Sequence, residues 1–240
     1  MPIGFRILQR QDKVAAADVD RFRRLPVANV SDVMSRLSAG GARLRPMHDC
    51  TVTLSGPALT VRTRPGDNLM VHKALDLAEP GDVIVVDGAG DLTNALIGEL
   101  MVSYAVRKQV AGIVIYGAIR DLASIRAGSF PVFAAGVTHR GPYKDGPGEI
   151  NVPIAIDGMV IAPGDLILGD DDGLLCVPLA HVDSIHAKAK AKYDAEQLTL
   201  AEIGGSGQDR SWVDAALKRL GCEIEEPVQV SSPQMPRSGP

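Results

Sequence analysis

The sequence predicts an α/β fold with a mixed central sheet flanked by helices. Early in the chain, apolar runs with strand character alternate with segments whose apolar residues recur at helical spacing. Later in the chain, short strands are joined by hairpin signals. Alternation is typical of parallel strands connected by helices, and hairpins are typical of antiparallel pairs, so the two patterns together predict a mixed sheet.

Composition limits the classes of protein to which the chain can belong. Its 240 residues suit one large domain, or one domain with appendages. Hydrophobic residues make up 45% of the chain and aromatic residues only 4%, so we expect a core built mainly from Val, Ile, Leu and Ala. The formal net charge of −4 argues against binding to nucleic acid through bulk charge.

Several features predict where the protein resides. No apolar run approaches the roughly 18 residues that a membrane-spanning helix needs, and the first residues lack the layout of a signal peptide. Cys50, Cys176 and Cys222 are too far apart for a CxxC metal site, and their odd number does not suit a disulfide framework. We therefore expect a cytoplasmic protein with buried thiols and no membrane contact.

The expected helices show apolar residues at helical spacing, and several begin at a capping residue or end at Gly or Pro. They cover residues 16–24, 31–37, 67–77, 94–106, 122–126, 180–201 and 212–220. Pro26 ends the first of these helices. Ser31 is the expected N-cap of the second, which Gly40-Gly41 ends, and Asp67 opens the third.

The expected strands are short apolar runs bounded by turn residues. They cover residues 51–54, 58–62, 83–87, 111–116, 130–134, 152–156, 160–162, 166–168 and 174–178. Ser55-Gly56-Pro57 is the turn expected between the first two. Asp157-Gly158 and Asp172-Gly173 are hairpin signals. The turns Pro80-Gly81-Asp82 and Pro163-Gly164-Asp165 each precede a strand and share one turn chemistry.

Three segments have a less regular composition. The Gly- and Pro-rich loop 138–148 is expected to be mobile. Residues 204–207 are expected to form a flexible break before the last helix. The Pro- and Ser-rich tail 226–240 is expected to be disordered.

The stretch 117–121, Gly-Ala-Ile-Arg-Asp, follows one expected strand and precedes a short helix. Neighbours in a strand point to opposite faces, so Arg120 and Asp121 can share a site only where the chain turns, and Gly117 permits that turn. A cation and a hard carboxylate at a strand end can bind a small anion and a divalent metal. Alternatively, Asp121 caps the following helix and Arg120 pairs with a surface carboxylate.

Two other polar clusters are weaker candidates for a site. The run 170–172, Asp-Asp-Asp, suggests a metal, but the hairpin turn between two apolar strands already explains it. His139, Arg140 and Lys144 lie in the polar loop and suit an anionic substrate, but a solvated loop is the simpler explanation.

Seven segments, in order along the chain, together resemble one known family. They are Asn29–Val33, Gly66–Leu69, Pro80–Val83, Gly98–Leu100, Gly117–Asp121, Pro131–Ala134 and Pro163–Asp165 with Gly169–Gly173. With these segments the chain resembles the family of 4-hydroxy-4-methyl-2-oxoglutarate/4-carboxy-4-hydroxy-2-oxoadipate aldolases, which also contains the regulator of ribonuclease activity A. The resemblance covers about residues 25–178.

The resemblance implies a swivelling β/β/α domain that assembles as trimers or hexamers, with active sites between subunits. We expect this catalytic domain over residues 1–180, a helical extension over 181–225 and the tail over 226–240. The implied activity is that of a class II aldolase, which uses Mg²⁺ or Mn²⁺ and no Schiff-base lysine. It would cleave 4-hydroxy-2-oxo di- or tricarboxylic acids to pyruvate and a second keto acid. Oxaloacetate decarboxylation is an expected side activity, because it passes through the same pyruvate enolate.

The resemblance also implies roles for acidic residues. Asp121 would be the direct metal ligand. Glu99 stands where the family has an acidic residue that helps to hold the metal, largely through water. An acidic residue from a neighbouring subunit's C-terminal helix completes the family's site, and Glu196 is our candidate for it.

Substrate contacts follow from the same resemblance. Arg120 would contact the pyruvyl part of the substrate. The backbone amides of the Gly98 turn, near Leu100 and Met101, would hold its carboxylate. The chain departs from the family at Tyr116, where the strand commonly ends in Asp before Gly.

A second hypothesis is a binding protein of the same fold, which regulates a ribonuclease without chemistry. Such a binder needs none of the three charged residues Glu99, Arg120 and Asp121. Their joint presence therefore favours the metal-dependent enzyme.

Overall fold

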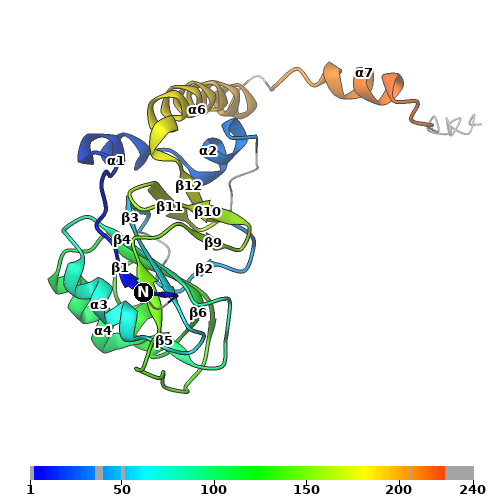
Figure 1. Cartoon of the computed structure of the whole chain (residues 1–240). Helices are drawn as coiled ribbons and strands as arrows, with labels where there is room; N and C mark the ends of the chain where they lie inside the picture. Colours follow the sequence, from blue (N-terminus) through cyan, green and yellow to red (C-terminus); the bar gives the residue numbers. More distant parts are fainter. Residues whose placement is uncertain (1–2, 36–39, 50–51, 206, 225–240) are drawn as a thin grey trace, which may run out of the picture. The chain divides into compact units, whose positions relative to one another are not determined.

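The computed structural model describes residues 3–35, 40–49, 52–205 and 207–224 (Figure 1). The chain divides into two compact units, Met1–Ala195 and Glu196–Pro240, and the predicted tail 226–240 lies outside the described residues. The second unit contains the end of α6 (Val182–Gly204) and α7 (Ser211–Arg219).

The first unit is built on a mixed ten-stranded sheet, which confirms the predicted fold class. Its parallel centre consists of β3 (Leu54–Thr63), β4 (Val83–Asp87), β6 (Gly112–Ile119) and β7 (Val132–Val137). The other strands of this sheet are β1 (Phe5–Ile7), β2 (Arg45–Pro46), β5 (Ala95–Ile97), β8 (Gly148–Ile150), β11 (Leu166–Asp170) and β12 (Gly173–Val177). β9 (Ile154–Ile156) and β10 (Met159–Ile161) form a separate hairpin.

Helices cover the sheet in two groups. The first group, α3 (Leu69–Leu77), α4 (Glu99–Arg107) and α5 (Leu122–Ala127), packs on one face of the parallel centre (Figure 1). The second group packs on β11 and β12, and consists of α1 (Ala16–Phe22), α2 (Val27–Val33), the 3-10 turn Leu179–His181 and the start of α6.

Residues of the central strands alternate between two cores. On β4, Ile84 and Val86 join the core under α3 and α4, whereas Val83 and Val85 join the core under the β9–β10 hairpin. All four are fully buried. Burial on both faces explains why this strand is a continuous apolar run and does not alternate with polar residues.

The predicted turn chemistry is confirmed at both Pro-Gly-Asp segments. The carboxylate of Asp82 accepts a hydrogen bond of 3.0 Å from the amide of Glu79, and Asp165 accepts one of 2.8 Å from the amide of Ala162. Both aspartates are buried. The glycine of each turn has a positive φ, 86° in the first and 89° in the second. The two predicted hairpins, β9–β10 and β11–β12, are also confirmed.

The turn predicted at residues 55–57 is wrong, because β3 passes straight through it. Ser55, Gly56 and Pro57 pair with β11 on the antiparallel side. A Cβ on Gly56 would overlap the carbonyl oxygen of Gly81, so the glycine serves close backbone approach instead of a bend.

The helix predicted over 31–37 begins earlier, at Val27, with Pro26 as its N-cap residue. Its first amide, that of Val27, donates a 2.9 Å hydrogen bond to Asp170 at the end of β11. A carboxylate distant in sequence therefore caps this helix, which local sequence cannot predict. Residues 36 and 37 of the prediction lie outside the described residues.

The helix predicted over 94–106 is also wrong at its start. Residues 95–97 form β5, which pairs with the end of β6, and α4 begins only at Glu99. The short strands β1 and β2, and β8 after the polar loop, were not predicted. The expectation of buried thiols holds for Cys176 but is wrong for Cys222, which is exposed, and Cys50 lies outside the described residues. Among the described residues, no helix is both long and apolar enough to cross a bilayer.

Candidate active site

The end of β6 presents Arg120 and Asp121. The strand does not turn at Gly117 as predicted, because Ala118 and Ile119 still pair with β5 and β7. The amide of Arg120 donates to the carbonyl oxygen of Ile97 at 3.0 Å, and the chain then turns at Asp121, which has φ 58° and ψ 37°. The left-handed backbone of Asp121 allows two neighbouring side chains to face one cavity.

The contacts of Asp121 distinguish between the two interpretations of this stretch. Its side chain makes no capping hydrogen bond to α5. Instead, Oδ2 accepts a hydrogen bond of 3.0 Å from the amide of Glu99 at the start of α4. Nε of Arg120 lies 3.9 Å from the same oxygen. Both side chains remain more than two-fifths exposed, at 43% and 42%, so each can reach a ligand.

Arg120 and Asp121 line a cavity of about 140 Å³. Its full lining is Asn68, His72, Ala95, Leu96, Ile97, Gly98, Leu100, Met101, Arg120, Asp121, Pro142 and Lys144. The predicted residues Gly98, Leu100 and Met101 therefore lie in the same hollow as the charged pair. Glu99 does not line it, and instead lines a separate cavity of about 370 Å³ with Ser124 and Phe130.

Gly98 brings the start of α4 close to Asp121. A Cβ at this position would overlap Oδ2 of Asp121 and lie 3.0 Å from Cγ of Arg120. Amides in the first turn of a helix have no intrahelical acceptor and carry a partial positive charge. The amide of Glu99 serves Asp121, and that of Met101 donates to the carbonyl of Gly98 at 3.1 Å. The amide of Leu100 is therefore the best-placed donor for a ligand carboxylate.

Of the cavity residues absent from the predicted site, three have polar side chains: Asn68, His72 and Lys144. Asn68 belongs to one of the segments that resemble the family, and Lys144 belongs to the polar loop that suits an anion. The sequence therefore gave some indication that both could belong to a site. His72 lies on α3, and nothing in the sequence singled it out. Burial and the positive charge of Lys144 lower the pKa of His72, while Asp76 raises it.

The loop 138–148, predicted to be mobile, is anchored by Asp67. This buried carboxylate accepts hydrogen bonds from the amides of Asp145 at 2.8 Å and Gly146 at 2.9 Å. It also accepts from the amide of Leu69 at 3.0 Å, which caps α3. One carboxylate therefore fixes both the helix that carries His72 and the loop that carries Lys144.

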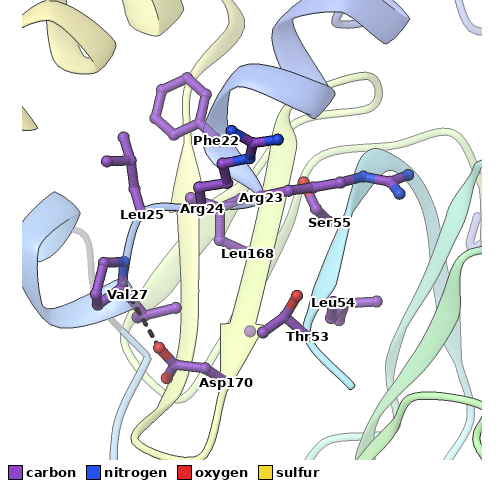
Figure 2. A pocket seen from close by; sticks show the side chains of 12 residues that line it. Phe22, Arg23, Arg24, Leu25, Val27, Thr53, Leu54, Ser55, Leu168 and Asp170 are labelled. Carbon is purple, nitrogen blue, oxygen red and sulfur yellow. Dashed lines mark hydrogen bonds between the residues drawn. The ribbon is translucent and has the colours of Figure 1, made fainter. Parts of the chain in front are cut away.

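Another cavity, of about 220 Å³, lies between the α1–α2 connection, β3 and β11 (Figure 2). Leu25, Leu54 and Leu168 contribute apolar surface, and Arg23 and Arg24 lie at its rim. None of the predicted site residues lines this cavity. Asp170 holds the hairpin and the start of α2, because its Oδ1 accepts from the amide of Asp172 at 3.0 Å and its Oδ2 accepts from Val27. The hairpin explanation of the triple-aspartate run therefore holds.

Asp121 fits a divalent metal that keeps several waters. Within the described part of the chain, no three His, Cys, Asp or Glu side chains gather as a metal site by themselves. Mg²⁺ commonly takes only one or two protein carboxylates, with the remaining ligands from water and substrate. The carboxylate of Asp121 is fixed by the Glu99 amide and still 42% exposed, which suits that habit.

Glu196 lies on α6 in the second unit, and its role stays a prediction. The predicted role is to complete the site of a neighbouring subunit, and it therefore concerns the assembly of several chains.

Comparison with known proteins supplies the family. A candidate 4-hydroxy-4-methyl-2-oxoglutarate aldolase of Halalkalibacterium halodurans is 40% identical over 182 residues, which are 75% of this chain and 86% of that protein. The 4-hydroxy-4-methyl-2-oxoglutarate aldolase of Thermus thermophilus is 38% identical over 112 residues, 47% of this chain and 68% of that protein. The solved structure of the RNA-processing inhibitor RraA from Thermus thermophilus has a TM-score of 0.59 at 32% identity, covering 64% of this chain and 92% of its own. The RraA-like family model, described as Aldolase/RraA, matches residues 27–176, more than half of the chain, and the protein therefore belongs to the RraA-like family.

Proposed function

We propose that the protein is a divalent-metal-dependent class II aldolase for small 4-hydroxy-2-oxo di- or tricarboxylic acids. The observation that carries this proposal is the shared cavity of Arg120 and Asp121 at the start of α4. The aldolases among the relatives support the reaction class.

The proposed reaction breaks the bond between C3 and C4 of the substrate. The 4-hydroxyl loses its proton to a base, its oxygen becomes a carbonyl, and the electron pair of the broken bond forms the enolate of pyruvate. Protonation of that enolate at C3 gives pyruvate. From 4-hydroxy-4-methyl-2-oxoglutarate the second product is also pyruvate. Oxaloacetate would lose CO₂ to give the same enolate, so decarboxylation is the expected side activity.

Each side chain has a task in this scheme. Arg120, which is always charged, binds the pyruvyl end in fork geometry, and the amide of Leu100 binds its carboxylate. Asp121 would hold Mg²⁺ or Mn²⁺, which when bound would supply positive charge to offset the developing enolate charge. Glu99 lines the neighbouring cavity, so we assign it an indirect role, the positioning of water that accepts the hydroxyl proton.

We further propose that the site is completed in a trimer or hexamer. Leu100 at the cavity is 83% exposed, and Tyr104, one turn further along the same helix, is 42% exposed. An apolar surface beside a cavity is typical of a subunit interface. Glu196 of a neighbouring subunit stays our candidate for the acidic residue that such an interface would add.

A non-catalytic regulator of a ribonuclease is the alternative. It is favoured by the structural relative that is called an RNA-processing inhibitor. A pure binding surface needs neither a carboxylate fixed by a helix amide nor a guanidinium beside it. We therefore favour the enzyme.

Turnover with and without metal tests the proposal. We expect pyruvate release from 4-hydroxy-4-methyl-2-oxoglutarate with Mg²⁺ or Mn²⁺, and its loss when EDTA is added. Asp121→Asn should reduce turnover by at least about a hundredfold with an unchanged circular dichroism spectrum, because electrostatic groups of this kind contribute on that scale. Asp171→Asn in the exposed β11–β12 turn is the matched control and should retain activity. Absence of turnover by folded wild-type protein would favour the regulator.

A further inference from the structure

Asn68 has a buried side-chain oxygen without a hydrogen-bond partner. The residue lines the cavity with Arg120 and Asp121, and only 2% of its surface is exposed. Within the described structure, its Oδ1 accepts no hydrogen bond. Leaving a buried acceptor unpaired costs about 1–3 kcal/mol, so this atom is expected to find a donor when the site is filled.

The orientation of the Asn68 amide is set by its donors. Nδ2 donates to the carbonyl oxygen of Leu96 at 2.9 Å and lies 3.4 Å from Sδ of Met101. A flipped amide would bring two oxygens together at Leu96, because a carbonyl oxygen can only accept. The backbone is also held, since the amide of Asn68 donates to Tyr143 and its carbonyl accepts from His72, both at 3.0 Å. Oδ1 is therefore a preorganised, buried acceptor on a residue that lines the cavity.

The chemistry of the substrate limits what can donate to this acceptor. At neutral pH the carboxylates and the keto group of a 2-oxo acid are acceptors only. In a 4-hydroxy-2-oxo acid, the 4-hydroxyl is the single group that carries a donor hydrogen. Oxaloacetate in its keto form carries none.

We propose that Asn68 is a specificity-determining residue whose Oδ1 accepts a hydrogen bond from the substrate's 4-hydroxyl. The proposal rests on the aldolase function proposed above. A site built to bind a hydroxyl disfavours an analogue without one, because the buried acceptor is then left unpaired. Asn68 therefore favours 4-hydroxy-2-oxo acids over oxaloacetate. The contact belongs to the bound substrate and weakens as the hydroxyl proton leaves, so it acts on KM more than on kcat.

The test compares two substrates in the same enzyme preparation. In Asn68→Leu, we expect KM for 4-hydroxy-4-methyl-2-oxoglutarate to rise about tenfold, which is the scale of one hydrogen bond, with little change in kcat. KM for oxaloacetate should stay the same or fall, because the unpaired acceptor is gone. The ratio of the two KM values cancels effects common to both reactions, such as a changed metal affinity, and a fraction of unfolded protein does not alter KM.

Two further variants separate hydroxyl recognition from a structural role. Asn68→Asp keeps an acceptor but loses the donor to Leu96, and should retain the wild-type ratio of KM values even if both activities fall. Asn68→Ala should shift the ratio as Asn68→Leu does, and serves if the leucine variant does not fold. Parallel changes for both substrates in all three variants, or no change, would overturn the role of Asn68. Wild-type protein that turns over neither substrate would instead overturn the proposed function itself.

Discussion

The backbone amide of Glu99 donates a 3.0 Å hydrogen bond to Oδ2 of Asp121. This contact ties the start of α4 to the end of β6, two points that the chain connects only through the whole lengths of α4 and β6. It occupies one carboxylate oxygen of Asp121 with a helix amide and so fixes the position of that carboxylate. The contact uses the backbone amide of Glu99, so it does not depend on which side chain stands at this position.

Gly98→Ala should disturb this contact directly. A Cβ would overlap Oδ2 of Asp121, so either the carboxylate or the start of α4 must move. We expect kcat/KM to fall at least about tenfold, since misplacement of a positioned group by about 1 Å can cost more than that. The apparent metal affinity should weaken as well, which a Mg²⁺ or Mn²⁺ titration of the activity measures.

Gly204→Ala is the control for that substitution. Among the described residues, no atom lies within 4 Å of a Cβ added at Gly204, and this position lines neither the cavity of Arg120 and Asp121 nor that of Glu99. This variant should keep wild-type kinetics. Equal effects of the two alanine substitutions would contradict the steric explanation.

Asp67→Asn should destabilise the fold and loosen the loop that carries Lys144. Replacing the charged oxygen that accepts from Asp145 and Gly146 by an NH₂ group brings donors against donors. We expect a loss of about 3 kcal/mol in the free energy of unfolding, measured by urea denaturation. Asp145→Asn, in an exposed side chain on the same loop, should change stability by less than about 0.5 kcal/mol.

Lys144→Met should weaken binding of substrates with a second carboxylate. Lys144 and Arg120 both line the cavity, so a dicarboxylate can meet one cation at each end. We expect KM for 4-hydroxy-4-methyl-2-oxoglutarate to rise about tenfold, and KM for a monocarboxylic 4-hydroxy-2-oxo acid to rise much less. Lys73→Met makes the same change in charge on α3 outside the cavity lining. A similar rise in both variants would point to long-range attraction instead of a contact.

His72 should make stability depend on pH in one direction. Burial and then the charge of Lys144 lower its pKa below the ordinary value of 6.5, so the unfolded chain binds this proton more readily than the fold does. The stability linked to His72 is therefore complete above about pH 6.5 and is lost as the pH falls. The effect is small, because the side chain is largely exposed.

Unfolding of the wild type and of His72→Gln between pH 8 and 5 measures this contribution. The wild type should lose more stability than the variant on acidification. In Lys144→Met, an NMR titration should find a higher pKa for His72. An unchanged pKa in that variant would show that the two side chains do not interact.

The sequence predicted the fold class from local patterns. β4 is buried on both faces and is therefore an uninterrupted apolar run in the sequence. In each of the two Pro-Gly-Asp turns, the aspartate carboxylate accepts a hydrogen bond from the amide three residues earlier. Such features depend on residues that are close together in the chain, so the sequence alone predicts them. Arg120 and Asp121 are adjacent in the chain, so the sequence alone also predicted that their side chains could share a site.

What only the tertiary structure decided depends on contacts between distant segments. Gly56 and Gly117 were expected to turn, but β3 and β6 run through them, because Gly56 pairs with β11 and the residues after Gly117 pair with β5 and β7. α2 begins at Val27 because Asp170 caps it from another strand. Lys144 joins Arg120 at the cavity only because Asp67, distant in sequence, holds the loop that carries it. A backbone amide or carbonyl takes whichever partner the fold brings to it, and that partner can lie a hundred residues away.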